Sequence, residues 1–437
     1  MIGGPKTGRN SWLRVLCRHA LIGICIGVLI LLPHGVGFLY AQDSGGFEGG
    51  FQASSPFLDQ LRGIEFGGLR IRPSFRQTIT YDDNIFLNDA GEGEGREEDI
   101  ISETQAGALL SFGLNVFEFD AKILPRYRYF MLHPEESTET LEGDFDFDFR
   151  IADLLDLKSD IGGRKGNRLF LETKNDVDLD SSPLDENLEP ERLARISDNF
   201  FLKIGYELSK KAQIAGFYRL AYVESLENDF ERINSLNHEA GLEFKYAVDP
   251  RLDYVAELLY GRAFHFERIL DDSQYVQGLT GFEGQPARRL AFRFLAGAQH
   301  RFPIDSSPFV DENEVTALVF NGGATYEVGP NTRLGVDAIR EIQLSTVSNF
   351  KTTTIGRVNV THNFTPKITG VARAEVQHEE PSNGGESIRY KAGIRFDYRL
   401  TDWVHFDLEY EFQLNEAEER DADFYNNRVT LGMSLQF

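Results

Sequence analysis

The sequence predicts an all-β protein, a transmembrane antiparallel β-barrel of the outer-membrane type with about 18 strands (roughly 16–18). Three observations predict this fold. The final residues, Tyr425–Phe437, alternate strictly between apolar and polar or small side chains. Short turns alternate with long acidic connections, and most stretches between them carry one apolar and one charged face. No apolar run long enough for a membrane-spanning helix follows residue 41, so a membrane crossing requires strands.

Composition is consistent with a large sheet protein. The chain has 437 residues, of which 12% are aromatic, including 35 Phe and 16 Tyr. Aromatic residues favour strands over helices. The formal net charge is −24, which argues against a nucleic-acid partner because such a partner needs a basic surface.

The chain divides into three predicted parts. Residues 1–41 are predicted to be a signal peptide cleaved after Ala41, with a basic start and an apolar segment at Ala20–Leu32 that is too short to span a bilayer. An uncleaved anchor is the alternative. Residues 42–67 are predicted to be a flexible periplasmic lead-in with one short helical candidate at 56–62, or a small plug, and residues 68–437 the barrel. Both cysteines, Cys17 and Cys25, lie in the signal, so the mature chain is expected to have no thiol.

Turn signals recur at intervals that fit hairpins. They are Lys210-Lys211, Asp249-Pro250, Gly284-Gln285-Pro286, Gly329-Pro330-Asn331, Thr365-Pro366-Lys367 and Thr401-Asp402. Longer acidic connections are expected between them, at 88–98, 133–137, 165–195, 226–232, 270–273, 304–313 and 415–423. Short periplasmic turns and long external loops are typical of outer-membrane barrels.

The alternating stretches decide between a barrel and a soluble sandwich. Clear examples are 117–129, 144–151, 388–400 and 404–414. Their polar faces carry full charges of both signs, as a water-filled lumen requires, whereas a sandwich would turn its apolar faces into one core. Residues 254–264 and 334–344 break the alternation, with Arg340 on the nominal lipid face, and we expect β-bulges there.

The charged faces supply the candidate site residues. A tight hairpin around Thr401-Asp402 would place Arg395 opposite Glu409 and Arg399 opposite His405. Basic and acidic ladders on opposed strands would set a transverse field across a lumen, while simple cross-strand pairing of wall residues is the plainer interpretation. The predicted lumen-facing charges are Arg70, Arg72, Arg76, Asp144, Asp146, Asp148, Arg389, Lys391, Arg395, Arg399, Asp407, Glu409 and Glu411.

No enzyme, cofactor or metal site is predicted. The histidines are scattered over different hairpins, and no nucleophile elbow or zinc-binding helix motif occurs. The stretch Asp176–Asp180 resembles the start of a calcium loop, but Ser181 and Asn187 stand where such a loop needs Gly and Glu. A solvated acidic loop, or weak bridging of divalent cations to lipopolysaccharide, are the two interpretations of this stretch.

One stretch has a more specific resemblance. Residues 72–86 end in Tyr81, Asp82, Asp83, Asn84, Ile85 and Phe86. This order predicts the end of a strand, then a polar turn, then an aromatic anchor near the membrane interface. With the recurring turns and the aromatic end, this stretch resembles the second family of β-barrel porins. The resemblance implies a large outer-membrane barrel, often associated with exopolysaccharide production, and it supplies no catalytic residues.

The expected function is therefore a channel in the outer membrane of a Gram-negative-type bacterium. Export of a secreted polysaccharide is the leading interpretation. A diffusion or substrate-selective uptake porin and a non-conducting surface or adhesive barrel are the alternatives. Expected partners are outer-membrane lipid and lipopolysaccharide, the barrel assembly machinery and a polysaccharide export apparatus.

The C-terminal strand is expected to close the barrel against the first strand, near 69–81, because a terminal strand edge must be paired. It also resembles the assembly signal of outer-membrane barrels. The residues that carry this resemblance are Val429, Leu431, Met433, Leu435 and Phe437.

Overall fold

The computed structural model describes the barrel and several of its connections. The described residues are 64–66, 68–87, 96–114, 117–146, 169–183, 192–225, 234–266, 271–304, 314–345, 348–418 and 423–436. The predicted signal peptide, the helical candidate at 56–62, Asp148 and Phe437 lie outside them. Within these ranges, no helix is long and apolar enough to cross a membrane.

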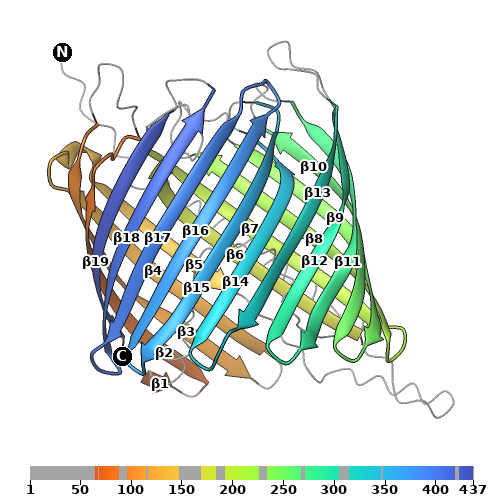
Figure 1. The fold of residues 1–437 in the computed structure, drawn as a ribbon, viewed down its shortest axis with the longest axis horizontal. Helices are drawn as coiled ribbons and strands as arrows, with labels where there is room; N and C mark the ends of the chain where they lie inside the picture. The colour runs from red at the N-terminus through yellow and green to blue at the C-terminus, as the bar shows by residue number, and fades with distance from the viewer. Residues whose placement is uncertain are drawn as a thin grey trace. The chain divides into compact units, whose positions relative to one another are not determined.

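Antiparallel strands that follow one another along the chain form the wall (Figure 1). The strands are β2 (Leu69–Asp82), β3 (Asp99–Leu114), β4 (Phe117–Phe130), β5 (Thr138–Asp146), β6 (Leu169–Pro183), β7 (Arg192–Glu207), β8 (Ala212–Ser225), β9 (Ser235–Asp249), β10 (Leu252–His265), β11 (Ser273–Ala287), β12 (Leu290–Pro303), β13 (Val315–Glu327), β14 (Thr332–Gln343), β15 (Lys351–Thr365), β16 (Ile368–Pro381), β17 (Ser387–Arg399), β18 (Val404–Ala417) and β19 (Phe424–Gln436).

Closure takes place between the last strand and the first long strand. β19 pairs antiparallel with β2, from Arg428 opposite Asp82 to Gln436 opposite Ser74. Each of the strands β2–β19 thus has two neighbours, which confirms the predicted closing pair and the predicted strand number. A short β1 (Ile64–Phe66) adds to β2 at its start, and a single 3-10 turn, η2 (Pro134–Glu136), lies between β4 and β5.

The two ends of the barrel differ, as the turn signals predict. The turns after β7, β9, β11, β13, β15 and β17 are short and lie at the end where β19 finishes. Figure 1 shows these tight turns at the lower end, beside the C-terminus. Short turns face the periplasm in outer-membrane barrels, so we call this the periplasmic end and the other the external end. The β11–β12 turn is at Arg288-Arg289, beyond the predicted Gly284–Pro286, which lies at a register shift in β11.

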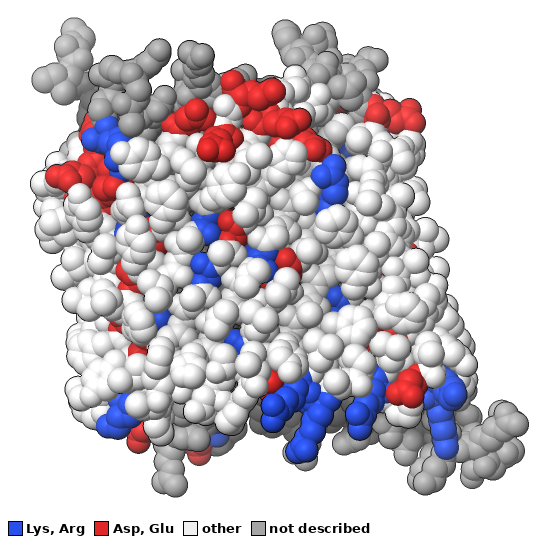
Figure 2. All heavy atoms as spheres, viewed as in Figure 1, with Lys and Arg blue, Asp and Glu red and all other residues white. Residues whose placement is uncertain are grey.

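The period of two directs apolar side chains outward. Exposed large apolar residues recur at every second position, as in Ile394, Phe396 and Tyr398 of β17 and Leu408 and Tyr410 of β18. Figure 2 shows the resulting band, which is mostly uncharged with a few charged side chains in it, with acidic side chains gathered along its upper rim and basic side chains along its lower rim.

Two sequence expectations are wrong. Residues 165–195 were expected to form one loop, but β6 and β7 occupy most of this range and pair with each other. The Asp176–Asp180 stretch is part of β6, with Asp176, Asp178 and Asp180 opposite Asn199, Ser197 and Arg195.

The bulges expected at 254–264 and 334–344 are also absent. β10 pairs without interruption from Asp253 to its end, and β14 keeps one register with β15. The broken alternation has other causes. In β10, Val255, Leu259 and Ala263 are apolar residues on the inner side. In β14, Arg340 stays on the outer side and is satisfied by Thr354 at 2.6 Å and Glu380 at 3.0 Å.

A close approach between β11 and β12 gives a test of the fold. A Cβ at Gly297 would lie 1.8 Å from the carbonyl oxygen of Gly278, while a Cβ at Gly278 would have nothing within 4 Å. We expect Gly297→Ala to destabilise the barrel by about 1–3 kcal/mol through overpacking. Unfolding by heat, followed as the mobility shift between folded and boiled protein on a gel, measures the effect. Gly278→Ala is the matched control, and equal midpoints for the two variants would contradict the close approach.

Candidate functional site: the inner wall and its external mouth

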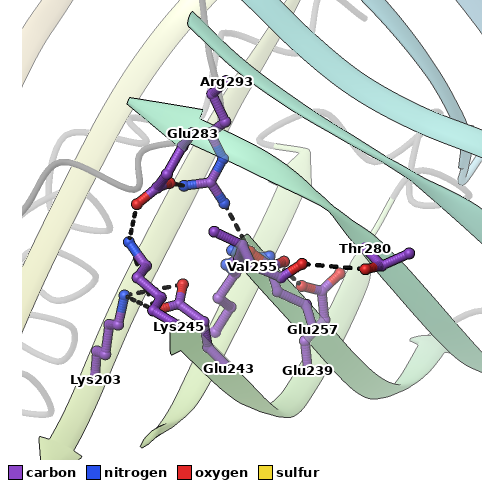
Figure 3. Close-up of polar contacts among 10 residues, drawn as sticks. Lys203, Glu239, Glu243, Lys245, Val255, Glu257, Thr280, Glu283 and Arg293 are labelled. Atoms are coloured by element: carbon purple, nitrogen blue, oxygen red, sulfur yellow. Dashed lines mark hydrogen bonds and ion pairs between the residues drawn. The ribbon is translucent and has the colours of Figure 1, made fainter. Parts of the chain in front are cut away.

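A chain of alternating charges crosses the inner wall from β7 to β12 (Figure 3). Lys203 Nζ lies 3.0 Å from Glu243 Oε1, and Lys245 Nζ lies 3.8 Å from the same oxygen. Lys245 Nζ also contacts Glu283 at 2.6 Å, and Arg293 joins Glu283 at 2.9 Å. The series of ion pairs ends where the Arg293 guanidinium contacts the Glu257 carboxylate at 2.6 Å. Three cations and three carboxylates of β7, β9, β10, β11 and β12 are thereby linked, and three of these contacts reach over an intervening strand.

This series of ion pairs neutralises two glutamates that face each other. Glu243 of β9 stands directly opposite Glu257 of β10, and two carboxylates in that position repel each other. Lys203 and Lys245 take up the charge of Glu243, while Arg293 takes up that of Glu257. The side chains of Lys203 and Glu243 are each only 3% exposed, so their charges are poorly screened by water. Removing one partner from such a pair leaves a buried charge and costs far more than the pair itself contributes.

Aromatic rings lie over glycines beside this chain. A Cβ at Gly241 would lie 2.3 Å from the ring of Phe217, and one at Gly261 would lie 2.1 Å from the ring of Tyr275. Phe217 and Tyr275 form a buried cluster with Leu259. Rings packed over strand glycines cover the backbone that glycine would otherwise expose. These side chains thicken the inner wall on the β8–β11 side.

Two arginines stack on the same rings. The guanidinium of Arg301 lies 4.4 Å from the Tyr275 ring centroid, and that of Arg219 lies 4.9 Å from the Phe217 centroid. Arg301 is fully buried, whereas Arg219 is 41% exposed and also contacts Glu239 at 3.3 Å. Arg219 is therefore a cation that the inner wall presents to water.

The predicted charges of β17 and β18 face each other in the predicted register. Arg395 stands opposite Glu409, and Arg399 opposite His405, which confirms the hairpin alignment. The ion pairs themselves run diagonally. Glu409 and Glu411 share Arg373 of β16, a residue that the sequence did not single out, and Arg395 binds Asp397 at 2.7 Å.

Asp407 connects this sector to the closing strands. Its carboxylate, 5% exposed, lies 3.2 Å from Arg76 of β2 and 3.9 Å from Arg395. Gly432 of β19 lies between these strands, and a Cβ there would come within 2.4 Å of the Asp407 carboxylate. The absence of a side chain at Gly432 lets Asp407 reach across to β2. Instead of opposed ladders of single charges, this part of the wall holds short clusters in which basic and acidic side chains contact one another.

The other predicted lumen charges are placed as follows. Arg70 contacts Glu65 of β1 at 3.0 Å, and Arg72 donates to Ser111 at 3.3 Å. Arg389 is buried in β17, and Lys391 stands between Glu375 and Gln413 in the strand register. Register places Asp144 opposite Lys122 and Asp146 opposite Asp120.

The family-like motif forms a clasp at the external end of the closing seam. Asp83 accepts from the backbone nitrogen of Asn427 at 2.6 Å and from its side-chain amide at 2.8 Å. Arg428 binds Asp82 at 2.9 Å, and Arg96 binds Asp83 at 2.5 Å. Desolvation opposes ionisation of Asp83, but the bonds from Asn427 and the Arg96 guanidinium hold its pKa below the usual range.

The rest of the motif completes this clasp. The Asn84 amide donates to the carbonyl of Tyr425 at 3.0 Å, and the Asn426 amide donates to the carbonyl of Asn84 at 3.3 Å. Ile85 is buried with Ile101 and Phe130, and Phe86 packs against them. The motif that suggested the family from sequence thus joins the two terminal strands of the barrel.

A short external connection lies inside the mouth of the barrel. No motif in the sequence marks it. Residues 344–350 connect β14 to β15, and Phe350 packs with Val319 and Ile342, against which Leu279 also lies. The Asn349 amide donates to Asp271 Oδ2 at 3.0 Å, and the Asp271 backbone donates to Asn349 Oδ1 at 3.0 Å. On the other side, the Ser382 backbone donates to the carbonyl of Phe350 at 2.8 Å. We call the described part of this connection, residues 344–345 and 348–350, the strap, because Asn349 and Phe350 tie the connection after β10 to the connection after β16.

The end of the β13–β14 pairing makes room for the strap. β13 pairs with β14 only from Phe320 to Glu327, so Val315–Val319 have no partner strand on that side among the described residues. Phe350 and Ile342 fill the space that this separation leaves. The end of the pairing at Phe320 is visible only in the structure.

A second external contact fixes the β4–β5 connection. The carboxylate of Asp99, fully buried, accepts from the backbone nitrogens of Met131, Leu132 and His133 at 2.9–3.0 Å. The His133 ring lies between Asp99 at 2.9 Å and Glu97 at 2.6 Å. The hydrogen bond to Asp99, with help from Glu97, outweighs desolvation and raises the pKa of His133 above 6.5. Within the described part of the chain, no group of acidic, histidine or cysteine side chains could hold a metal ion.

The charge chain predicts a large effect for a single neutralisation. Glu283→Gln leaves Lys245 and Arg293 without their shared partner, and we expect a loss of about 3–5 kcal/mol in unfolding free energy. Denaturant unfolding of the protein in lipid vesicles measures the loss. Glu327→Gln is the control, because its partner Arg333 lies 3.9 Å away and both are more than half exposed, so about 0–1 kcal/mol is expected. A similar small change in both variants would show that the chain does not hold the wall.

The His133 contact predicts a pH dependence. Because the folded state raises the pKa of His133, its contribution to the stability of the β4–β5 connection is fully present below about pH 6.5 and is lost as pH rises through the folded-state pKa. NMR titration of the imidazole should give a pKa above that of free histidine, and Glu97→Gln should lower it. Hydrogen exchange at 131–133, corrected for the intrinsic rate, should accelerate on the alkaline side. A His133 pKa at or below the free value would contradict the contact.

Part of the chain matches a known protein family. Residues 240–437 match the family described as "Putative beta-barrel porin 2". This match covers the closing strand, the β14–β19 sector and the strap, but not the Tyr81–Phe86 motif. No curated protein matches the chain.

Solved porins show a more distant likeness. OpdK of Pseudomonas aeruginosa with vanillate is 10% identical, with a TM-score of 0.45 over 84% of this chain and 99% of OpdK. A BenF-like porin from Pseudomonas fluorescens Pf-5 is 10% identical, with a TM-score of 0.46 over 85% and 100%. OccK2 (OpdF) of Pseudomonas aeruginosa in complex with glucuronate is 11% identical, with a TM-score of 0.45 over 84% and 98%. The closed antiparallel wall is that of a β-barrel of the outer-membrane type, and residues 240–437, somewhat less than half of the chain, are similar to the family "Putative beta-barrel porin 2".

Proposed function

We propose that this protein is an outer-membrane channel through which a secreted polysaccharide leaves the cell. The observation that carries the proposal is the closed wall of strands β2–β19, whose inner side is lined with charges. A barrel of this size is too wide for its own wall side chains to fill, so it encloses an aqueous passage. The family resemblance to barrels associated with exopolysaccharide production supports the same direction.

The chemistry of the wall suits a hydroxyl-rich polymer. Cations and carboxylates on the inner side are paired with one another, as in the Lys203–Glu257 chain and the Arg373–Glu409–Glu411 cluster. Paired charges still offer hydrogen bonds to hydroxyl groups, but they set only a weak net field. Transport needs contacts that are weak and repeated, because a tightly bound substrate does not leave.

Uptake of a small solute is the second candidate, and one observation favours it. The strap lies inside the mouth and is tied on both sides, to Asp271 and to Ser382. A fixed loop at this position narrows the external entrance, which suits selection among small molecules better than passage of a polymer. Under the export proposal, an extended polysaccharide passes beside the strap.

A cysteine-blocking experiment tests export. Arg219→Cys places a thiol on the inner wall at a water-exposed position, and Leu318→Cys places one on the outer side at a position 63% exposed. In a strain whose own copy of the gene is deleted, both variants should restore polysaccharide secretion. A bulky membrane-impermeant thiol reagent should then reduce secretion several-fold through Arg219→Cys and leave Leu318→Cys unchanged.

Two results would overturn the export proposal. The first is normal polysaccharide secretion in the deletion strain. The second is secretion through modified Arg219→Cys at the control level while uptake of small solutes falls, which would favour the uptake porin. Planar-bilayer recordings of the purified protein address the non-conducting alternative, since both channel functions require conductance that the reagent reduces in Arg219→Cys.

A further inference from the structure

The periplasmic end of the barrel carries a set of cations with a common position. They lie in the short turns after β7, β9, β11 and β15, and every one of them is exposed. Figure 2 shows basic side chains gathered along this lower rim on the face in view. We call these residues the basic rim: Lys210, Lys211, Arg251, Arg288, Arg289 and Lys367.

The basic rim differs from the inner wall in its charge balance. On the wall, Lys203, Lys245 and Arg293 each have a carboxylate within 3.0 Å. For the six cations of the rim, no ion pair with a described Asp or Glu is found, and the Lys367 ammonium donates only to a neutral group, the carbonyl of Leu400, at 3.1 Å. The net positive charge of this end is therefore available to an outside partner.

Acidic side chains gather at the opposite end. Exposed carboxylates at the external mouth include Glu97, Glu98, Glu314, Glu416 and Glu418. The same separation is visible in Figure 2, with red above the uncharged band and blue below it. Among the described residues of this chain of net charge −24, the exposed cations lie at the periplasmic end.

Aromatic side chains give the depth of the basic rim in the membrane. Tyr206, Tyr246, Phe282, Phe364 and Trp403 are exposed and lie within a few residues of the periplasmic turns. Tyr and Trp gather where hydrocarbon meets the headgroup layer. Cations just beyond this aromatic belt lie at the level of the headgroups.

We propose that the basic rim binds the headgroups of anionic phospholipids in the periplasmic leaflet. Ammonium and guanidinium groups form charge-assisted hydrogen bonds with phosphate, and guanidinium does so with two parallel bonds. Basic residues near a membrane surface attract anionic lipid over a distance set by the ionic strength. The position beside the outer aromatic belt favours lipid over a polymer in the lumen, whose contacts would be with the paired charges of the wall. The proposal is independent of what the channel carries.

Lipid enrichment around the intact barrel tests the proposal. The protein is reconstituted into nanodiscs of phosphatidylethanolamine with a minor fraction of phosphatidylglycerol, and the lipids that stay bound on extraction are counted by native mass spectrometry. The test variant carries Lys210→Gln, Lys211→Gln, Arg288→Gln and Arg289→Gln. We expect wild-type protein to enrich phosphatidylglycerol over the bulk, and the variant to lose at least about fivefold of that enrichment. Raising the salt concentration should weaken the wild-type enrichment in the same direction.

Control variants separate charge at the rim from charge in general. Glu416→Gln with Glu418→Gln changes exposed charges at the external end and should keep the wild-type enrichment. Lys210→Arg with Lys211→Arg keeps the rim charge and should keep it as well. The mobility shift on heating shows that each variant is folded. If the fourfold variant does not assemble, Lys210→Gln with Lys211→Gln alone must lower the enrichment.

Two outcomes overturn the proposal. One is equal phosphatidylglycerol enrichment in the wild type and in the folded rim variant. The other is rim-dependent binding of a soluble anionic polymer, with dextran sulfate as the probe, by protein that shows no preference for phosphatidylglycerol. The second outcome would make the rim a polymer-binding surface.

Discussion

The strands of this protein have to form a closed wall, and the rest of the structure depends on that constraint. Inside a bilayer there is no water to satisfy a free row of backbone groups, so a sheet is stable there only when it closes. The seam between β2 and β19 is where the closure takes place, between residues that lie at opposite ends of the chain. The clasp formed by Asp82, Asp83 and Asn84 strengthens the seam at its external end with side-chain bonds that backbone pairing alone would not provide. A motif first noticed as a family resemblance thereby acquires a physical role.

Closure leaves an inner surface whose charged groups must be compatible with water and with one another. The wall meets this requirement with charges that neutralise one another between strands, often across an intervening strand, and with aromatic rings that lie over glycines on the β8–β11 side. The strap adds a third device at the external mouth, where β13 and β14 separate. Together these features describe a passage whose shape is fixed by contacts between residues distant in sequence.

The sequence predicts the parts of this architecture that repeat. Alternation identifies the outward faces of β17 and β18, and the Thr401-Asp402 turn fixes the register that places Arg395 opposite Glu409, because a hairpin leaves little freedom of alignment. It also predicts that β19 closes on β2. The failures have physical causes. Asp176–Asp180 lies in a long, densely charged stretch that predicts a loop, but the backbone of this stretch pairs with β7. The parity breaks in β10 and β14 were read as bulges, although an apolar residue can face inward and an arginine can face outward when a partner such as Glu380 is in reach.

The candidate site is less predictable than the fold because its contacts are diagonal and long-range. Arg373, Lys203 and Glu243 look like ordinary wall residues in the sequence, and only the three-dimensional register brings them to their partners. The Asn349–Asp271 bond joins residues 78 positions apart, between two connections that carry no motif. Periodicity gives the face of a strand, but it does not give the neighbour of a side chain two strands away.

The alternating chain from Lys203 to Glu257 has a consequence for how this protein can change over time. Each inner member touches two opposite charges, so a substitution at Lys245 or Glu283 alone exposes neighbours on both sides. A tolerated change would have to replace charges in linked pairs, or exchange their signs along the chain. Related barrels are therefore expected to keep or lose this series of ion pairs as a whole, while the outward-facing apolar residues are substituted independently of one another.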